Sequence, residues 1–519
     1  MNPTHVTDSS FEDWTRRADA LILLLTIAVL LLIPLRIMAY GFLPPDDALR
    51  HAAKAVTGRP WPEIILMRPD LQMDHHVGWH HLLGWIHRTL GAGTDGLVAF
   101  ALVLMPSSVL LAGLLDGRRR PEGWLASLLV ASIVMAPIAR LMLARPFVLS
   151  MGMLIVTLVI WTREDSGLRW RTRVALAAVP LALATWIHGS IWYLFPLVIA
   201  AFGLARRWRE TAGVAMSWAA GTLAGALATG EPWTFLSGHL RHAAYAFGGA
   251  DLTRQLVSEF QPTDGLSGVI LLTAILLSAR CLLRGKESLS GLLRDPVFIL
   301  CALGWMLSLR VSRFWSDWGM PAYLLWMARE INGLTATTAA GHPRARLALS
   351  CAALTSLFWI CTSDVQGRWT SQATTEYLEA SDPRLAGWLP DDGGIFYNDS
   401  MTVFYRTFFK NPDARWRYAL AYEPALMPPE DLKIYRKIQW NFHDIKTYEP
   451  WVEKMRPQDR LVLSRARSSR PSIGQLEWLY SASGVWIGRL PADRPDRAAG
   501  TPPDIRAQRV SPTAAIDPE

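Results

Sequence analysis

Charged residues and cysteines are scarce in this chain of 519 residues. Asp, Glu, Lys and Arg make up 18% of it, whereas soluble globular domains carry about 25%. The four cysteines (Cys281, Cys301, Cys351 and Cys361) lie in or beside apolar runs and form no CxxC pair, which excludes a disulfide framework and a cysteine-based metal site. A Walker loop, a GxSxG elbow and a basic-aromatic nucleic-acid module are also missing, so we expect no nucleic-acid partner.

Apolar residues, in contrast, make up 51% of the chain and come in blocks such as residues 21–35. With its flanks, such a block reaches the roughly 20 residues that cross a bilayer as a helix. The sequence therefore predicts an α-helical polytopic membrane bundle with about 11 transmembrane helices. The predicted spans are 20–40, 95–115, 124–140, 146–162, 174–187, 191–205, 211–229, 265–283, 295–310, 318–333 and 347–363.

Basic residues predict the orientation of this bundle. Alternate loops are rich in arginine, as in the segments 118–120, 163–173 and 206–209. Because cytoplasmic loops carry the excess of Lys and Arg, residues 1–19 are expected to be a cytoplasmic tail. The transmembrane part is then 20–363, and an odd number of spans places residues 364–490 outside. We expect an integral protein of a bacterial inner membrane with a periplasmic C-terminal domain.

Two segments on the outer side are longer than simple connections. The first, 41–94, contains two helical patterns that end at Gly58 and Gly91, and its tryptophans (Trp61, Trp79 and Trp85) suit a membrane interface. We therefore expect two helices that lie along the membrane surface. The second, 230–264, is expected to hold a shorter helix and a loop.

The composition changes after residue 364. Strand-like runs at 393–398, 415–422 and 459–466 alternate with helical stretches at 399–409 and 428–440. Residues 476–490 predict a hairpin that turns at Ser483-Gly484. The region 364–490 is thus expected to be a small α/β domain, and 491–519, rich in Pro, Arg, Asp and Ala, a disordered tail.

Unusual polar residues gather on the outer side of the predicted bundle. Ionisable groups near a membrane need a partner or a function. Asp46 and Asp47 follow the first span directly. Adjacent carboxylates can act as a general base or bind a metal; alternatively, Asp46 caps the next helix.

Histidines and arginines on that side leave further alternatives open. In Asp74-His75-His76, followed by His80, the HxxxH spacing can bind a divalent metal together with Asp74; the histidines can also pack or contact lipid headgroups. His188 lies in a tight turn, where a packing role competes with a site. Arg313 can clamp a phosphate or form a structural pair with Asp317.

The layout resembles the GT-C superfamily of membrane glycosyltransferases. The resemblance rests on Asp46-Asp47 in a long first outer loop with two surface helices, on the late turn Arg313-Phe314, and on a C-terminal domain outside the membrane. It implies a sugar donor on a polyprenyl phosphate. Carried over by position, Asp46 is the first choice for general base and Asp47 the second. A metal held by Asp74, His76 and His80 is a further expectation.

The expected reaction is displacement at an anomeric carbon with inversion and without a covalent enzyme intermediate. Arg313, Arg145 and Arg241 are predicted to neutralise the departing lipid phosphate. His75, His76, His188 and Asp317 are predicted to bind substrate or acceptor, which could be a protein, a lipid or a glycan. Membrane lipids are expected partners.

Two other functions fit the same layout: a flippase or transporter for a lipid-linked sugar, and a scaffold that binds a lipid carrier without catalysis. No repeated pair of broken helices, typical of transporters, is evident in the sequence. In the C-terminal domain Tyr405, Arg406, Trp416, Arg417 and Tyr418 either contact the acceptor or pack in the core.

Overall fold

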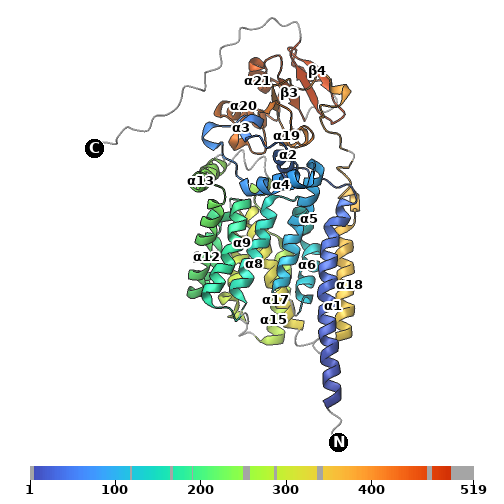
Figure 1. Cartoon of the computed structure of the whole chain (residues 1–519), viewed down its shortest axis with the longest axis vertical. Coiled ribbons are helices and arrows are strands. Elements are labelled where there is room, and N and C mark those ends of the chain that lie inside the picture. The colour runs from blue at the N-terminus through green and yellow to red at the C-terminus, as the bar shows by residue number, and fades with distance from the viewer. Residues whose placement is uncertain are drawn as a thin grey trace, which may run out of the picture.

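The computed structural model describes residues 5–116, 120–163, 167–189, 191–248, 258–285, 289–335, 343–373, 375–464 and 470–491. Long helices form an upright bundle, and a mixed helical and stranded domain lies at one end of it (Figure 1). The predicted tail 491–519 lies outside the described residues from 492 onward.

Each of the eleven predicted spans contains helix. The bundle consists of α1 (His5–Met38), α5 (Thr94–Ala112), α6 (Glu122–Val134), α8 (Pro146–Thr162), α9 (Trp170–Ile187), α10 (Ile191–Leu194), α11 (Pro196–Leu204), α12 (Trp208–Leu227), α15 (Ser267–Arg284), α16 (Pro296–Ser308), α17 (Met320–Thr335) and α18 (Pro343–Thr362). Two predicted spans are interrupted. The span 124–140 breaks after α6 and resumes as the short α7 (Pro137–Leu141), and 191–205 is divided between α10 and α11.

Among the described residues, three helical stretches are long and apolar enough to cross a membrane: Trp14–Met38, Thr94–Leu115 and Pro343–Thr362. A fourth candidate is the pair formed by α12 and α13 (Pro232–Gly248), which is bent by 108°. A helical bundle with helices that can span a membrane is thus confirmed, while the number eleven stays a prediction.

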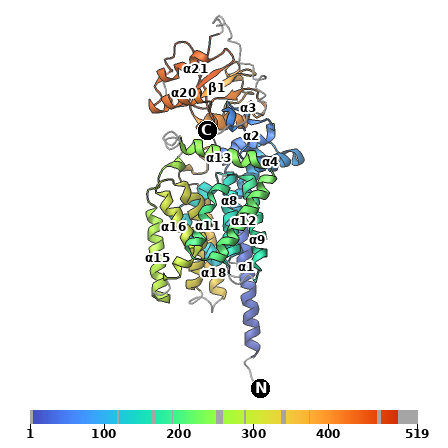
Figure 2. The same cartoon turned by 90° about the vertical axis from the view of Figure 1, so that its left-hand side faces the viewer.

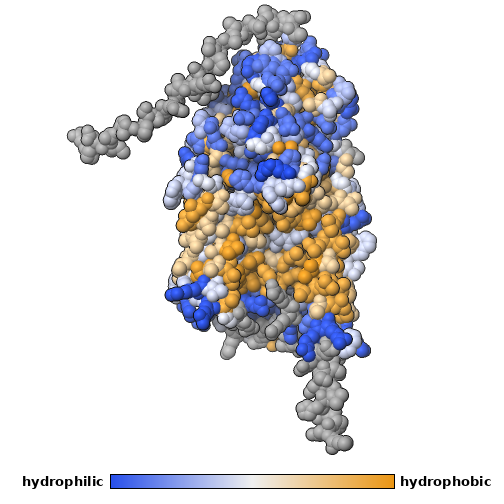
Figure 3. Space-filling view, in the orientation of Figure 1, coloured by the Kyte–Doolittle hydropathy of each residue, from blue (hydrophilic) through white to orange (hydrophobic). Residues whose placement is uncertain are grey.

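The surface of the bundle is also consistent with helices that span a membrane. On the face that Figure 3 shows, an apolar belt crosses the helices, with polar surface on the C-terminal domain and at the opposite end. Large apolar side chains on several helices are exposed, among them Ile133, Val179, Leu223, Ile275 and Leu349. Such a belt is unfavourable in water and is favourable against lipid chains.

Small residues on α12 allow close packing against its neighbours. Gly213, Ser217, Gly221 and Gly225 recur every four residues and are buried. A Cβ atom at Gly221 would lie 2.7 Å from the carbonyl oxygen of Ala178 on α9, and one at Gly225 would lie 2.5 Å from that of Ala182. Spacing of this kind lets two membrane helices approach closely.

A layer between the bundle and the C-terminal domain contains α2 (Asp47–Thr57), α3 (Trp61–Ile64), α4 (Val77–Leu90) and α13 (Figures 1 and 2). Gly58 and Gly91 follow α2 and α4 in left-handed backbone conformations, with φ of 63° and 64°. Both predicted helix ends are therefore confirmed. The segment 230–264 contains the expected helix, α13, and a 3₁₀ turn at Ser258–Phe260.

The predicted interfacial role of the loop tryptophans is largely wrong. Trp61 and Trp79 are 2% and 0% exposed and pack inside the protein, and only Trp85 is exposed. Trp61 packs against His80, Phe408 and Tyr422. The C-terminal domain covers Trp61, whereas Trp79 packs against Phe100 of α5.

The C-terminal domain is a five-stranded mixed sheet with three helices. Its strands are β1 (Ile395–Asn398), β2 (Arg417–Tyr418), β3 (Arg460–Leu463), β4 (Glu477–Tyr480) and β5 (Trp486–Arg489), in the order β2-β1-β3-β5-β4. The helices are α19 (Met401–Lys410), α20 (Pro429–Trp440) and α21 (Glu449–Lys454). Each predicted strand run contains a strand, and β4 and β5 form the predicted antiparallel hairpin.

Backbone hydrogen bonds attach the first loop to this domain. The amide of Leu66 donates to the carbonyl of Tyr418 at 2.8 Å, and the amide of Arg68 donates to that of Leu426 at 2.9 Å. Residues far apart in sequence are thereby held together above the end of the bundle.

We predict that Gly225→Leu lowers the thermal unfolding midpoint of the purified protein, because the added side chain would overlap α9. Overpacking of this kind costs about 1–3 kcal/mol. Ala224→Leu adds the same side chain one residue earlier, on the exposed side of α12, and should leave the midpoint nearly unchanged. Equal midpoints for the two variants would contradict the packing described here.

Candidate functional site

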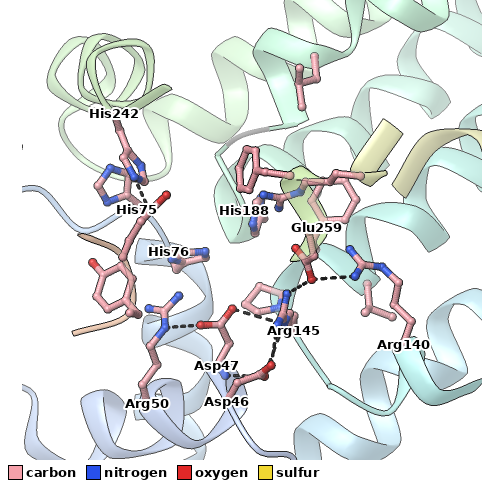
Figure 4. A pocket seen from close by; sticks show the side chains of 18 of the residues that line it. Asp46, Asp47, Arg50, His75, His76, Arg140, Arg145, His188, His242 and Glu259 are labelled. Carbon is pink, nitrogen blue, oxygen red and sulfur yellow. Dashed lines mark hydrogen bonds and ion pairs between the residues drawn. The ribbon is translucent and has the colours of Figure 1, made fainter. Parts of the chain in front are cut away.

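A cavity of about 430 Å³ lies where the end of the bundle meets the first loop and the C-terminal domain. Residues from six separate parts of the chain line it. They include Asp46, Asp47, Arg50, His75 and His76 from the first loop; Arg140 and Arg145; His188; His239, His242 and Glu259; Arg313; and Tyr405, Tyr422 and Glu423 from the C-terminal domain. Figure 4 shows how the charged side chains among them converge.

Asp46 and Asp47 stand at the start of α2, which fixes their positions. The Asp46 side chain caps this helix, since its Oδ1 accepts a hydrogen bond from the amide of Asp47 at 2.6 Å. The predicted cap is therefore confirmed, and the same residue also lines the cavity. Asp47 accepts a hydrogen bond from Nε of Arg50 at 2.6 Å and one from the hydroxyl of Tyr405 at 3.4 Å.

Arg145, directly before α8, connects three carboxylates. Its Nη2 lies 2.5 Å from Oδ2 of Asp46, its Nε lies 3.6 Å from Oδ2 of Asp47, and its Nη1 contacts Glu259 (Figure 4). The guanidinium fork suits such shared contacts. The pair Asp46–Asp47 is thereby held against a positive charge from another part of the chain.

The network continues beyond Arg145 with alternating charges. Arg140 donates from Nη1 to Glu259 at 2.8 Å and also contacts Asp317. Arg313 donates from Nε to the other oxygen of Asp317 at 2.7 Å. Each arginine that lines the cavity therefore has a carboxylate partner.

The two adjacent carboxylates differ in their pKa. Burial raises the pKa of Asp46, and the charge of Asp47 adds to this effect, while Arg145 opposes it. Burial also acts on Asp47, but Arg50 and Arg145 outweigh it and hold its pKa below the ordinary value. Asp46 is consequently the stronger proton acceptor of the pair.

Histidines form a wall of the cavity. The ring centre of His75 lies 4.3 Å from that of His242 and 5.0 Å from that of His239, and the rings of His76 and His188 are 4.9 Å apart. Burial lowers the pKa of His75 and His76 well below the ordinary value. These rings are neutral at pH 7, so each offers one N–H donor and one acceptor nitrogen.

His75 stands out within this wall. It is 3% exposed, and neither of its ring nitrogens has a hydrogen-bond partner among the described residues. A buried polar atom without a partner is unfavourable by about 1–3 kcal/mol. Because His75 lines the cavity, a bound molecule with hydroxyl groups could supply the missing partners.

The cavity brings together most of the residues that the sequence singled out: Asp46, Asp47, Arg145, Arg313, His75, His76 and His188. Two predictions need correction. Arg241 is exposed on α13 and does not line the cavity. Asp317 is 1% exposed, forms ion pairs with Arg140 and Arg313, and does not line the cavity.

The predicted metal ligands Asp74, His76 and His80 are also arranged differently from a metal site. Asp74 accepts hydrogen bonds from Nδ1 of His80 at 2.6 Å and from the amide of His76 at 2.9 Å. Nε2 of His80 lies 2.8 Å from Nδ1 of His51, so both ring nitrogens of His80 are engaged. Within the described ranges no group of three His, Cys, Asp or Glu residues could hold a metal ion.

Sequence reasoning missed Arg50, Glu259, Tyr422 and Glu423. Arg50 had a usable signal, because it follows Asp47 by three residues on a helix, where opposite charges pair. Glu259 and the pair Tyr422-Glu423 lie in connecting segments without a motif. Only the folded chain brings them to Arg145, Arg50 and His242.

Of the C-terminal residues considered for contact with an acceptor, Tyr405 lines this cavity. Trp416 and Tyr418 are buried in the core, where the indole N–H of Trp416 donates to the hydroxyl of Tyr418 at 2.9 Å.

Comparison with known proteins gives no match: no family model and no curated protein is similar to this chain.

We predict that Glu259→Gln destabilises the protein, because Arg140 and Arg145 lose the carboxylate they share. Removing one partner of a buried ion pair costs up to about 3–5 kcal/mol, and Glu259 is 14% exposed. Glu376→Gln is the control, because its pair with Arg384 is largely exposed and contributes about 1 kcal/mol or less. Thermal unfolding of both variants measures the difference; comparable losses would contradict the importance of the buried network.

Proposed function

We propose that this protein is a membrane glycosyltransferase of the GT-C type. It would move a sugar from a polyprenyl-phosphate donor to an acceptor hydroxyl on the side of the C-terminal domain. The observation that carries the proposal is the cavity at the end of an apolar bundle in which two adjacent carboxylates face arginines from distant segments. A carboxylate for the acceptor and cations for the phosphate are the groups that such a transfer needs.

The arginines support the phosphate part of the proposal. Arg145 and Arg313 both line the cavity, and a guanidinium can bind phosphate oxygens with two parallel hydrogen bonds. A lipid donor would place its phosphate at this depth and its chain against the apolar belt of the bundle (Figure 3). The phosphate would compete with the carboxylates that now hold the two guanidinium groups.

The reaction proceeds as a single displacement in this proposal. The oxygen of the acceptor hydroxyl attacks the anomeric carbon, the bond from that carbon to the phosphate oxygen breaks, and polyprenyl phosphate leaves with the electron pair. The proton of the hydroxyl moves to Asp46. Attack opposite the leaving group inverts the anomeric centre, with Asp46 as base and Arg145 and Arg313 facing the phosphate.

The contact between Arg145 and Asp46 would couple donor binding to the base. Arg145 lowers the pKa of Asp46 in the structure. When a donor phosphate takes up the charge of Arg145, this effect weakens and Asp46 becomes more basic. The base would thus be strongest when the donor is in place.

The histidine wall supports recognition of a hydroxylated substrate. Neutral imidazoles of His75, His76 and His188 can each donate and accept a hydrogen bond. The nitrogens of His75 that lack partners are well suited to sugar hydroxyls. We therefore keep these three histidines as the proposed substrate-binding residues.

The orientation and the location belong to the proposal as well. The arginine-rich loops favour a cytoplasmic N-terminus, and an odd number of spans would then place the cavity on the periplasmic side of a bacterial inner membrane. The N-terminal end of α1 lies at the end of the bundle opposite the C-terminal domain (Figure 1), which is compatible with this arrangement.

We predict that Asp46→Asn lowers sugar transfer by about 10²–10⁴-fold, the usual contribution of a general base. Purified protein would be incubated with a lipid extract that contains polyprenyl-phosphate sugars and with envelope material as acceptor. Release of polyprenyl phosphate is then followed by mass spectrometry. Asp264→Asn, an exposed carboxylate outside the cavity, is the matched control.

Two results of this experiment would refute the enzyme proposal. One is full activity of Asp46→Asn with an unchanged thermal midpoint. The other is movement of the intact donor across vesicle membranes by the wild type, without any release of polyprenyl phosphate, which is the behaviour of a flippase.

A second prediction concerns pH. Protonated Asp46 cannot accept a proton, so kcat/KM should fall as the pH drops through its raised pKa. Arg145→Gln removes a charge that lowers this pKa, and the acid limb of the residual activity should therefore move to higher pH. Arg241→Gln, which removes an exposed arginine outside the cavity, should leave the limb in place. An unmoved limb in Arg145→Gln would exclude Asp46 as the base.

A further inference from the structure

A second cavity, of about 230 Å³, lies inside the C-terminal domain. It is bounded by one side of α19, by the turn of the β4–β5 hairpin and by the segment 376–378. Eight of its lining residues are polar or charged and define its chemistry: Glu376, Tyr377, Ser400, Thr402, Arg406, Thr407, Ser464 and Ser483.

Arg406 differs from every arginine of the main cavity. Arg50, Arg140, Arg145 and Arg313 each pair with at least one carboxylate. Nη2 of Arg406 instead donates to the neutral amide of Gln372 at 2.7 Å, and its guanidinium carbon lies 5.9 Å from the ring centre of Tyr377. Among the described residues no carboxylate lies within ion-pair distance of it.

The acidic residue that lines this cavity pairs with another arginine. Glu376 lines the same cavity, but it pairs with Arg384 at 3.0 Å. Arg406 is half-buried, and this burial lowers its pKa. A partly desolvated cation without an anionic partner is unfavourable. An anionic group bound in this cavity would supply that partner to Arg406.

The other lining residues restrict the kind of anion. Hydroxyl groups of serine and threonine can exchange hydrogen bonds with a polyol, and the ring of Tyr377 offers an apolar face. The volume is below the roughly 300–1,000 Å³ of pockets for drug-sized ligands. One sugar ring with an acidic substituent combines the required size, hydroxyl groups and charge.

The two cavities are neighbours along α19. Thr402, in the first turn of this helix, lines both of them. Tyr405 faces the main cavity, and the following residue, Arg406, faces the second one. A chain of sugars that occupied the second cavity would therefore reach the carboxylates of the main cavity across Thr402.

We propose that the second cavity is an acceptor subsite that binds an acidic sugar unit, with Arg406 as the partner of its carboxylate or phosphate. This inference rests on the proposed glycosyltransferase function. It selects, among protein, lipid and glycan acceptors, one that carries an anionic saccharide.

The test measures binding of three probes to the full-length protein in lipid nanodiscs: D-glucuronate, D-glucose 6-phosphate and D-glucose. At least one anionic probe should bind about tenfold more tightly than glucose, as expected for a charge-assisted hydrogen bond. The comparison of glucuronate with glucose 6-phosphate shows which acidic group the subsite prefers. Equal affinity for all three probes would overturn the proposal.

Variants of α19 connect this preference to Arg406. Arg406→Gln should abolish the advantage of the anionic probe, and Arg406→Lys should restore part of it. Lys410→Gln is the matched control, because it removes a cation from the same helix that also lies 5.7 Å from the ring of Tyr377 but does not line the cavity. An anionic preference that survives in correctly folded Arg406→Gln would place the binding elsewhere.

The subsite and the proposed function can fail separately. Asp46→Asn should bind the anionic probe as tightly as the wild type does while sugar transfer is lost. If the wild type binds the anionic probe but transfers no sugar, the proposed subsite is supported and the proposed glycosyltransferase function is rejected. Transfer by the wild type without preference for an anionic probe would reject the subsite alone.

Discussion

The contact of Arg145 with Asp46 and Glu259 is the interaction on which the site depends. It joins carboxylates that are 99 and 114 residues away in sequence. In the largely buried cavity, none of these charges would be tolerated alone, because desolvation penalises an unpaired ion strongly. The pairing therefore holds together the first loop, the start of α8 and the segment after α13.

The same interaction shapes the chemistry that the cavity can perform. Two adjacent carboxylates would repel each other in isolation. Arg145 reduces this repulsion, and of the two carboxylates Arg50 forms its ion pair with Asp47. The two neighbours therefore differ in basicity although they are the same residue type. A cation next to the more basic carboxylate is the arrangement that the proposed transfer would use.

The C-terminal domain completes the site. It supplies Tyr405, Tyr422 and Glu423 to the main cavity, and its backbone is attached to the first loop through Leu66 and Arg68. The layer of α2, α4 and α13 lies between this domain and the bundle (Figure 2). A substrate in the cavity would thus contact the bundle and the domain together.

Local patterns in the sequence determined the helices, their ends and much of the polar site. The apolar blocks predicted helix at every expected position, Gly58 and Gly91 ended α2 and α4, and the position of Asp46 predicted its cap. Such features depend on neighbours within a few residues. Only the tertiary structure decided that Trp61 and Trp79 are core residues and that His80 is engaged with Asp74. It also decided that Arg241 does not line the cavity, whereas Glu259 and Glu423 do. These outcomes depend on which distant surfaces meet, because burial and charge pairing arise only when the chain has folded around them.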